Sequence, residues 1–204
     1  MTEQRSKNLL DPELHRDSCG FGLIANLDDL PSHWVIERAI DALVRLTHRG
    51  AVAADGKTGD GCGLLIKFPE SFLRAVGEEQ GFTLAKRFAA GTVFLSQDEA
   101  TADEARQVIN QALADNGLEV AGWRDVPVDP SVCGDQALAT MPKFEQVFVN
   151  ARDTLPRGAF NRKLFLARRR AERLLKDDET YVASLSSVTV SYKGMVMPLS
   201  LIHI

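Results

Sequence analysis

Asp17-Ser18-Cys19-Gly20-Phe21-Gly22-Leu23-Ile24 is the stretch that decides how this chain is interpreted. A polar leader precedes Cys19, and the small and apolar residues after it predict a first, buried strand over residues 19–27. Cleavage after Ser18 would leave a thiol and a free α-amine on the same residue. Because an α-amine has a pKa of roughly 7.7–8.0, it could act as general base for that thiol. Cys19 is therefore a candidate nucleophile, and the alternative is a small buried hydrophobic residue.

The composition is that of a globular protein, with 45% hydrophobic and 25% charged residues among 204. The net charge of −4 gives no reason to expect a nucleic-acid or anionic-membrane partner. No apolar run approaches the ~20 residues that span a bilayer, and the first eighteen residues lack the apolar core of a secretory signal. We therefore expect a cytoplasmic protein.

The three cysteines are Cys19, Cys62 and Cys133. Their odd number and wide spacing argue against a disulfide framework, and no Cys-x-x-Cys or Cys/His cluster indicates a metal site. Cys62 starts an apolar strand and is expected in the core.

Apolar periodicity predicts a mixture of helices and strands. Helices are predicted over about 33–48, from Pro69 onward, over 98–115 and over about 158–176. Strands are predicted over 61–68, 89–95, 118–126 and 143–150, and within 181–192. The absence of strict strand–helix–strand alternation favours an α+β layered fold.

The same periodicity predicts which helix faces are buried, and Ser32 is the expected N-cap of the first helix. The predicted inward residues are Ile36, Ala39, Ile40, Leu43 and Thr47 in the first helix, Phe72, Leu73 and Val76 in the second, and Leu164, Ala167, Ala171 and Leu174 or Leu175 in the last. The seven basic side chains of residues 162–176 are then expected to form a solvated face rather than a nucleic-acid site.

Further segments carry a resemblance to a known family. They are Thr47-His48-Arg49-Gly50-Ala51, Asp55-Gly56-Lys57-Thr58-Gly59-Asp60-Gly61-Cys62-Gly63-Leu64-Leu65, Gly122-Trp123-Arg124-Asp125-Val126-Pro127, Phe148-Val149-Asn150 and Tyr192-Lys193-Gly194-Met195. With Cys19-Gly20-Phe21-Gly22 they make the chain, over roughly residues 15–198, resemble the start of glutamate synthase large chains. The first domain of that family is a class II glutamine amidotransferase.

The resemblance implies a four-layer αββα sandwich of the N-terminal nucleophile hydrolase type, here incomplete. Residues 1–18 are then a leader that is removed, and residues 19–198 form the N-terminal part of the amidotransferase domain. Residues 199–204 depart from the family's pattern and could be foreign sequence. The family's Asn-Gly oxyanion motif and its clamps for the glutamine α-groups would follow Pro198, so a fragment of this extent is expected to have negligible glutaminase activity.

The resemblance also implies the reaction. Cys19 would hydrolyse L-glutamine to glutamate and ammonia, and the ammonia would convert 2-oxoglutarate into a second glutamate. FMN and a 3Fe-4S iron–sulfur cluster belong to the downstream synthase domains, and the electron donor is an NADPH-oxidising small subunit or ferredoxin. No residue of this chain is expected to bind these cofactors.

Four residues are expected to bind substrate beside Cys19. By resemblance Arg49 and Gly50 belong to the active-site wall, although Arg49 could instead complement the dipole of the helix before it. The Gly-rich loop 55–63 lacks the spacing of a phosphate-binding loop, so we expect a tight turn with Asp60 and Gly61 nearest the substrate. Asp60 could orient Arg49 or the α-amine, while His48 is expected to be structural.

Two other functions stay open. Another class II amidotransferase could share the nucleophile and send ammonia to a sugar phosphate or an aspartate. A non-enzymatic regulatory or binding module would retain the leader and bury Cys19.

Overall fold

The computed structural model describes residues 20–151 and 155–196. In chain order the helical elements are α1 (His33–Arg45), the 3-10 turn η1 (Thr47–Arg49), α2 (Glu70–Glu79), α3 (Glu99–Asp115), the 3-10 turn η2 (Pro130–Val132), α4 (Asp135–Ala139) and α5 (Arg157–Leu174). The strands are β1 (Thr58–Lys67), β2 (Phe88–Leu95), β3 (Glu119–Asp125), β4 (Lys143–Asn150), β5 (Tyr181–Ser186) and β6 (Thr189–Val196). No helix in these two ranges is long and apolar enough to cross a membrane.

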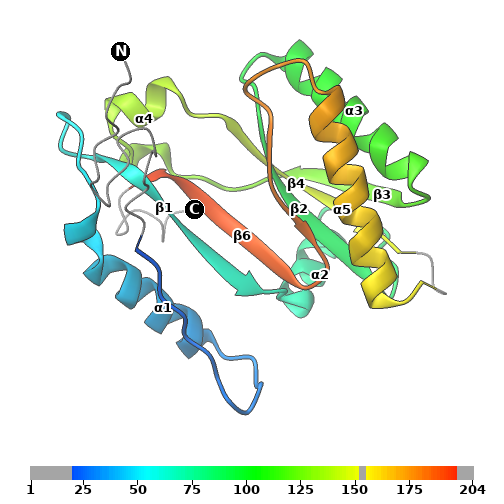
Figure 1. The fold of residues 1–204 in the computed structure, drawn as a ribbon, viewed down its shortest axis with the longest axis horizontal. Helices are drawn as coiled ribbons and strands as arrows, with labels where there is room; N and C mark the ends of the chain where they lie inside the picture. The colour runs from blue at the N-terminus through cyan, green and yellow to red at the C-terminus, as the bar shows by residue number, and fades with distance from the viewer. Residues whose placement is uncertain (1–19, 152–154, 197–204) are drawn as a thin grey trace, which may run out of the picture.

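Four antiparallel strands form the central sheet in the order β3-β4-β2-β5. Successive side chains of a strand point to opposite faces, so one face carries Ala89, Val93, Val147 and Val149. Helices α3 and α5 pack against each other and cover this face (Figure 1). Their fully or almost fully buried side chains are Ala102, Ala105, Ile109, Ala112 and Leu113 of α3 and Phe160, Leu164, Ala167 and Ala171 of α5. This is the larger hydrophobic core.

The opposite face of the sheet is shared by α2 and by a second sheet. Leu73 of α2 packs with Phe88, Ala90 and Phe148 in a smaller core. Strands β1 and β6 pair antiparallel in the second sheet, and α1 lies beyond them (Figure 1). Buried Gln146 of β4 links the two sheets, since its amide donates to the Tyr192 hydroxyl at 3.0 Å.

The predicted mixture of helices and strands is confirmed, but the first predicted strand is wrong within the described residues. Residues 20–26 form no regular element, and Phe21 and Leu23 are 94% and 89% exposed. A strand needs partners for its backbone N–H and C=O groups. No strand among the described residues pairs with this stretch, and a turn with Asp29 at φ +54° ends it. Cys19 itself lies outside the described residues.

The helix faces were predicted more closely. Ser32 is the N-cap of α1, and its hydroxyl accepts from the Trp34 amide at 3.2 Å. The predicted inward residues of α1 are half-buried, and none of its residues is fully buried. In α2, Leu73 is buried while Phe72 points outward and is 54% exposed. Of the two candidates at the end of α5, Leu175 packs against the larger core and Leu174 is exposed.

Candidate functional site

The predicted Gly-rich turn is shorter than expected: residues 54–57 form the turn, and strand β1 begins at Thr58, so Asp60 and Gly61 lie on the strand. The start of this strand meets the segment after η1. Gly56 and Gly61 have φ angles of +69° and +108°, which glycine adopts without strain. The Asp60 carboxylate accepts a hydrogen bond from the Ala51 amide at 2.7 Å, and Val52 pairs with Gly59 in an isolated bridge. Three predicted substrate residues, Gly50, Asp60 and Gly61, are therefore brought together.

Arg49 and Cys19 are the other two predicted site residues, and the structure describes only the backbone of Arg49. Arg49 ends the turn η1 directly before Gly50, and its side chain is not among those described. Cys19 also lies outside the described residues. The Asp60 carboxylate binds backbone at Ala51, which fixes the loop beside Arg49.

His48 has the structural role expected of it. Its Nδ1 lies 2.9 Å from the Arg45 carbonyl oxygen. A carbonyl only accepts, so Nδ1 carries the proton and donates to the end of α1.

The loop also makes a contact that the sequence did not reveal. Asp55 accepts hydrogen bonds from the amides of Lys57 and Thr58 and from the Thr58 hydroxyl, and it reaches the Gln136 amide of α4. These donors, the Thr58 hydroxyl above all, hold the pKa of the Asp55 carboxyl well below its usual range. The residues in contact are 81 positions apart, and no local pattern marks such a pair.

A cavity of about 1060 Å³ lies against this loop. Asp60 and Gly61 line it from β1, and Lys193 and Gly194 line it from β6, where Gly194 pairs with Cys62. Its other walls are the end of β2 and the segment around η2 and α4. A concave space of this kind, with a few polar groups around apolar walls, is suited to a small ligand.

Cys62 lines this cavity and is half-buried, so the expectation of a core position was wrong. Strand β1 is partly exposed from Asp60 onward, because β6 is the only strand of the described residues that pairs with it and Val52 adds a single bridge at Gly59. Burial raises the pKa of the Cys62 thiol to about 11. Because the thiolate is the reactive form, Cys62 is a poor nucleophile at neutral pH.

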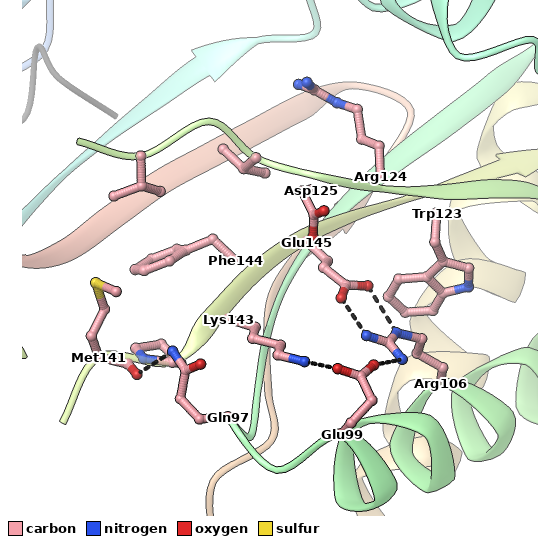
Figure 2. A pocket seen from close by; sticks show the side chains of 13 residues that line it. Gln97, Glu99, Arg106, Trp123, Arg124, Asp125, Met141, Lys143, Phe144 and Glu145 are labelled. Atoms are coloured by element: carbon pink, nitrogen blue, oxygen red, sulfur yellow. Dashed lines mark hydrogen bonds and ion pairs between the residues drawn. The ribbon is translucent and has the colours of Figure 1, made fainter. Parts of the chain in front are cut away.

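A second cavity, of about 580 Å³, borders the first and shares Gln97, Val128, Met141, Pro142 and Phe144 with it. Figure 2 shows Glu99, Arg106, Lys143 and Glu145 paired with one another. Arg106 forms two hydrogen bonds to buried Glu145, at 3.0 and 2.5 Å, and it also binds Glu99, which pairs with Lys143. The hydrogen bonds to Glu145 raise the pKa of Arg106 above its ordinary value. We interpret this cluster as structural, since each of these charges already has a partner.

The sequence matches the model of the glutamine amidotransferases class-II family over residues 19–203. The chain belongs to the class II glutamine amidotransferases. The match begins at Cys19, the candidate nucleophile, and it includes the Gly-rich loop and both strands that line the larger cavity.

Curated relatives of this amidotransferase chain are named as glutamate synthases. Ferredoxin-dependent glutamate synthase 1 of Arabidopsis thaliana is 39% identical over 195 residues, which cover 93% of this chain and 12% of the relative. The glutamate synthase [NADPH] large chains of Azospirillum brasilense and Bacillus subtilis are each 36% identical, over 93% and 95% of this chain and 13% of each relative. The chain thus spans only 12–13% of the length of these relatives.

No group of three or more His, Cys, Asp or Glu side chains within 20–151 and 155–196 is placed to hold a metal ion.

Proposed function

We propose that this chain is the N-terminal part of the glutaminase domain of a glutamate synthase, with Cys19 as the N-terminal nucleophile of that domain. The observation that carries the proposal is the family match, which starts at Cys19. Two kinds of relative, ferredoxin-dependent and NADPH-dependent, share the name glutamate synthase and align over almost the whole chain. Removal of residues 1–18 would expose the α-amine that the nucleophile needs.

The proposed reaction uses two acyl transfers. The α-amine of Cys19 takes the thiol proton, and the thiolate attacks the side-chain carboxamide carbon of glutamine. The carbon–nitrogen bond breaks, ammonia leaves with a proton returned by the amine, and a glutamyl thioester remains. Water activated by the same amine then cleaves the thioester, which releases glutamate and restores the thiol.

The substrate would lie against the Gly-rich loop. In support, the Asp60 carboxylate accepts from the amide of Ala51, which follows Arg49 and Gly50 in the chain, and Asp60 and Gly61 line the larger cavity. We assign Arg49, Gly50, Asp60 and Gly61 to substrate binding. A guanidinium at position 49 would hold a carboxylate or orient a loop carbonyl through two parallel hydrogen bonds.

We further propose the four-layer αββα sandwich as the complete fold. In support, α3 and α5 cover the four-stranded sheet, β1 and β6 begin a second sheet on its opposite side, and α1 lies beyond them (Figure 1). Residues 19–198 would then be the N-terminal part of this domain, after a leader of residues 1–18 and before an atypical tail of residues 199–204.

In the whole protein, the ammonia would convert 2-oxoglutarate into a second glutamate. FMN, a 3Fe-4S cluster and an NADPH-oxidising subunit or ferredoxin would serve that step in other domains. We also propose a cytoplasmic location.

The test is ammonia release from L-glutamine by the full-length gene product. Cys19→Ala should lower kcat/KM by at least about 10³-fold, as expected for loss of a nucleophile. Phe165→Ala is the matched control. Phe165 is an exposed residue of α5 that does not line the cavity, so this variant should keep wild-type activity. Equal ammonia release by the wild type and Cys19→Ala would refute the proposal.

A further inference from the structure

The N-terminus of α4 is capped by side chains from a distant loop. Its N-cap residue, Gly134, has no side chain to satisfy the first amides of the helix. Asp55 accepts from the Gln136 amide at 3.3 Å, and the Thr58 hydroxyl accepts from the Ala137 amide at 3.3 Å. Residues about 80 positions apart therefore perform the capping that a local Ser or Asp usually performs.

The two carboxylate oxygens of Asp55 accept hydrogen bonds from different partners. Oδ1 accepts from the amides of Lys57 and Thr58, at 3.0 and 2.8 Å, and so closes the turn of its own loop. Oδ2 accepts from the Thr58 hydroxyl at 2.5 Å and from the Gln136 amide. One carboxylate thus joins the Gly-rich loop to α4.

Gly134 fits this contact because it has no Cβ. A Cβ at Gly134 would lie 2.3 Å from Asp55 Oδ2, 2.4 Å from Thr58 Oγ1 and 2.6 Å from the Thr58 amide nitrogen. The φ angle of Gly134, −83°, is open to any residue, so close approach is the reason for glycine here. The two segments meet without space for a single methyl group.

The segment held in this way forms one side of the larger cavity. Val132, Cys133, Ala137 and Thr140 line the cavity from this side, and we call them the α4 wall. Asp60 and Gly61, which follow Thr58 on strand β1, line it from the other side. The loop therefore sets the distance between the proposed glutamine-binding residues and the facing wall.

We propose that Asp55 and Thr58 are positioning residues that hold the α4 wall against the glutamine site. This inference rests on the proposed function of the same cavity. Loosening the wall weakens contacts made equally to bound glutamine and to the transition state, so KM rises while kcat changes little.

The experiment breaks the contact from either side in the full-length gene product. Asp55→Asn retains an oxygen for the turn but presents an NH₂ group to the Gln136 amide. Gly134→Ala inserts a methyl group from the other side. Thr58→Ser keeps the hydroxyl, and Gly158→Ala, where an added Cβ has no atom within 4 Å, is the matched control for the glycine change.

Two readouts are made on each variant, amide hydrogen exchange at Gln136 and Ala137 and the glutaminase KM and kcat. Asp55→Asn and Gly134→Ala should each speed hydrogen exchange at the Gln136 and Ala137 amides. Each should also raise KM about tenfold and leave kcat within about twofold of the wild type, as expected for losing charge-assisted hydrogen bonds. The double variant should be no worse than either single change, because both disrupt one contact. Thr58→Ser and Gly158→Ala should behave as wild type.

The outcomes separate this inference from the proposed function. Unchanged exchange in Asp55→Asn and Gly134→Ala would overturn the capping contact. Faster exchange with an unchanged KM would overturn its role in placing the wall for glutamine. A wild-type protein that releases no ammonia would refute the proposed function, and hydrogen exchange alone would then decide whether Asp55 and Thr58 hold α4.

Discussion

The two sides of the central sheet differ in how completely they are packed. Under α3 and α5, the helices and strands bury a continuous core in which Phe160, Leu164 and Val147 have no exposed surface. On the side of β1, β6 and α1, helix α1 buries none of its residues, and Phe21 and Leu23 are almost fully exposed. The residues proposed to bind glutamine all lie on this second, less packed side. The well-packed core and the proposed glutamine site thus lie on opposite sides of the central sheet.

The contrast teaches what an apolar pattern can and cannot predict. The apolar residues of α5 are buried because an apolar face of the central sheet lies opposite them. Residues 20–27 have an equally suggestive pattern, but no strand in the described part of the chain pairs with them. Apolar spacing predicts a surface that can be buried, and a partner decides whether it is buried.

The largest expected effect on stability comes from the packed side. Phe160→Ala should lower the free energy of unfolding by about 3–5 kcal/mol, since it removes a fully buried ring and leaves a cavity. Phe165→Ala, on the same helix but 59% exposed, should change it by less than about 0.5 kcal/mol. Urea unfolding of the two variants measures the difference. Equal losses would mean that α5 does not bury the face described here.

The next effect concerns the ion pairs at the edge of the packed side. Arg106→Met leaves Glu145 buried without its two hydrogen bonds, so we expect a loss of about 3 kcal/mol. Arg169→Met removes an exposed partner of Glu172, which keeps Arg168, and should cost less than about 0.5 kcal/mol. The same unfolding measurement applies. A loss as small for Arg106→Met as for Arg169→Met would show that Glu145 does not depend on this pair.

The smallest effect concerns thiol reactivity on the less packed side. Because burial raises the pKa of Cys62 to about 11, its reactive thiolate form should be about 100-fold rarer at neutral pH than for an ordinary thiol. Alkylation of Cys62 in the folded chain should keep rising between pH 8 and pH 11. In urea it should reach half of its maximum near pH 9, the ordinary pKa of the thiol, and level off above that pH. A midpoint near pH 9 in the folded chain would contradict the raised pKa.

Much of the fold could be predicted from local sequence. The bounds of β4 match the predicted 143–150, and α3 and α5 differ from prediction by no more than two residues at either end. Buried Leu164, Ala167 and Ala171 follow from helical spacing alone. The short elements η2 and α4 were not predicted, because three to five residues carry too little periodicity to be recognised.

The site was predictable only in part. Gly50, Asp60 and Gly61 do come together, as the motifs suggested, through the Asp60–Ala51 hydrogen bond. The link from Asp55 and Thr58 to α4 could not be predicted, because it joins side chains to amides about 80 positions away. The roles of Cys19 and Arg49 stay predictions.

The central claim is that Cys19 becomes an N-terminal nucleophile. The most direct test is the intact mass of the full-length gene product before and after treatment with a glutamine-mimicking diazo-ketone, with the adduct located by peptide mapping. We predict a loss equal to residues 1–18 and a single adduct on Cys19, with Cys62 and Cys133 unmodified. A retained leader and an unmodified Cys19 would contradict the account and favour a non-enzymatic binding module.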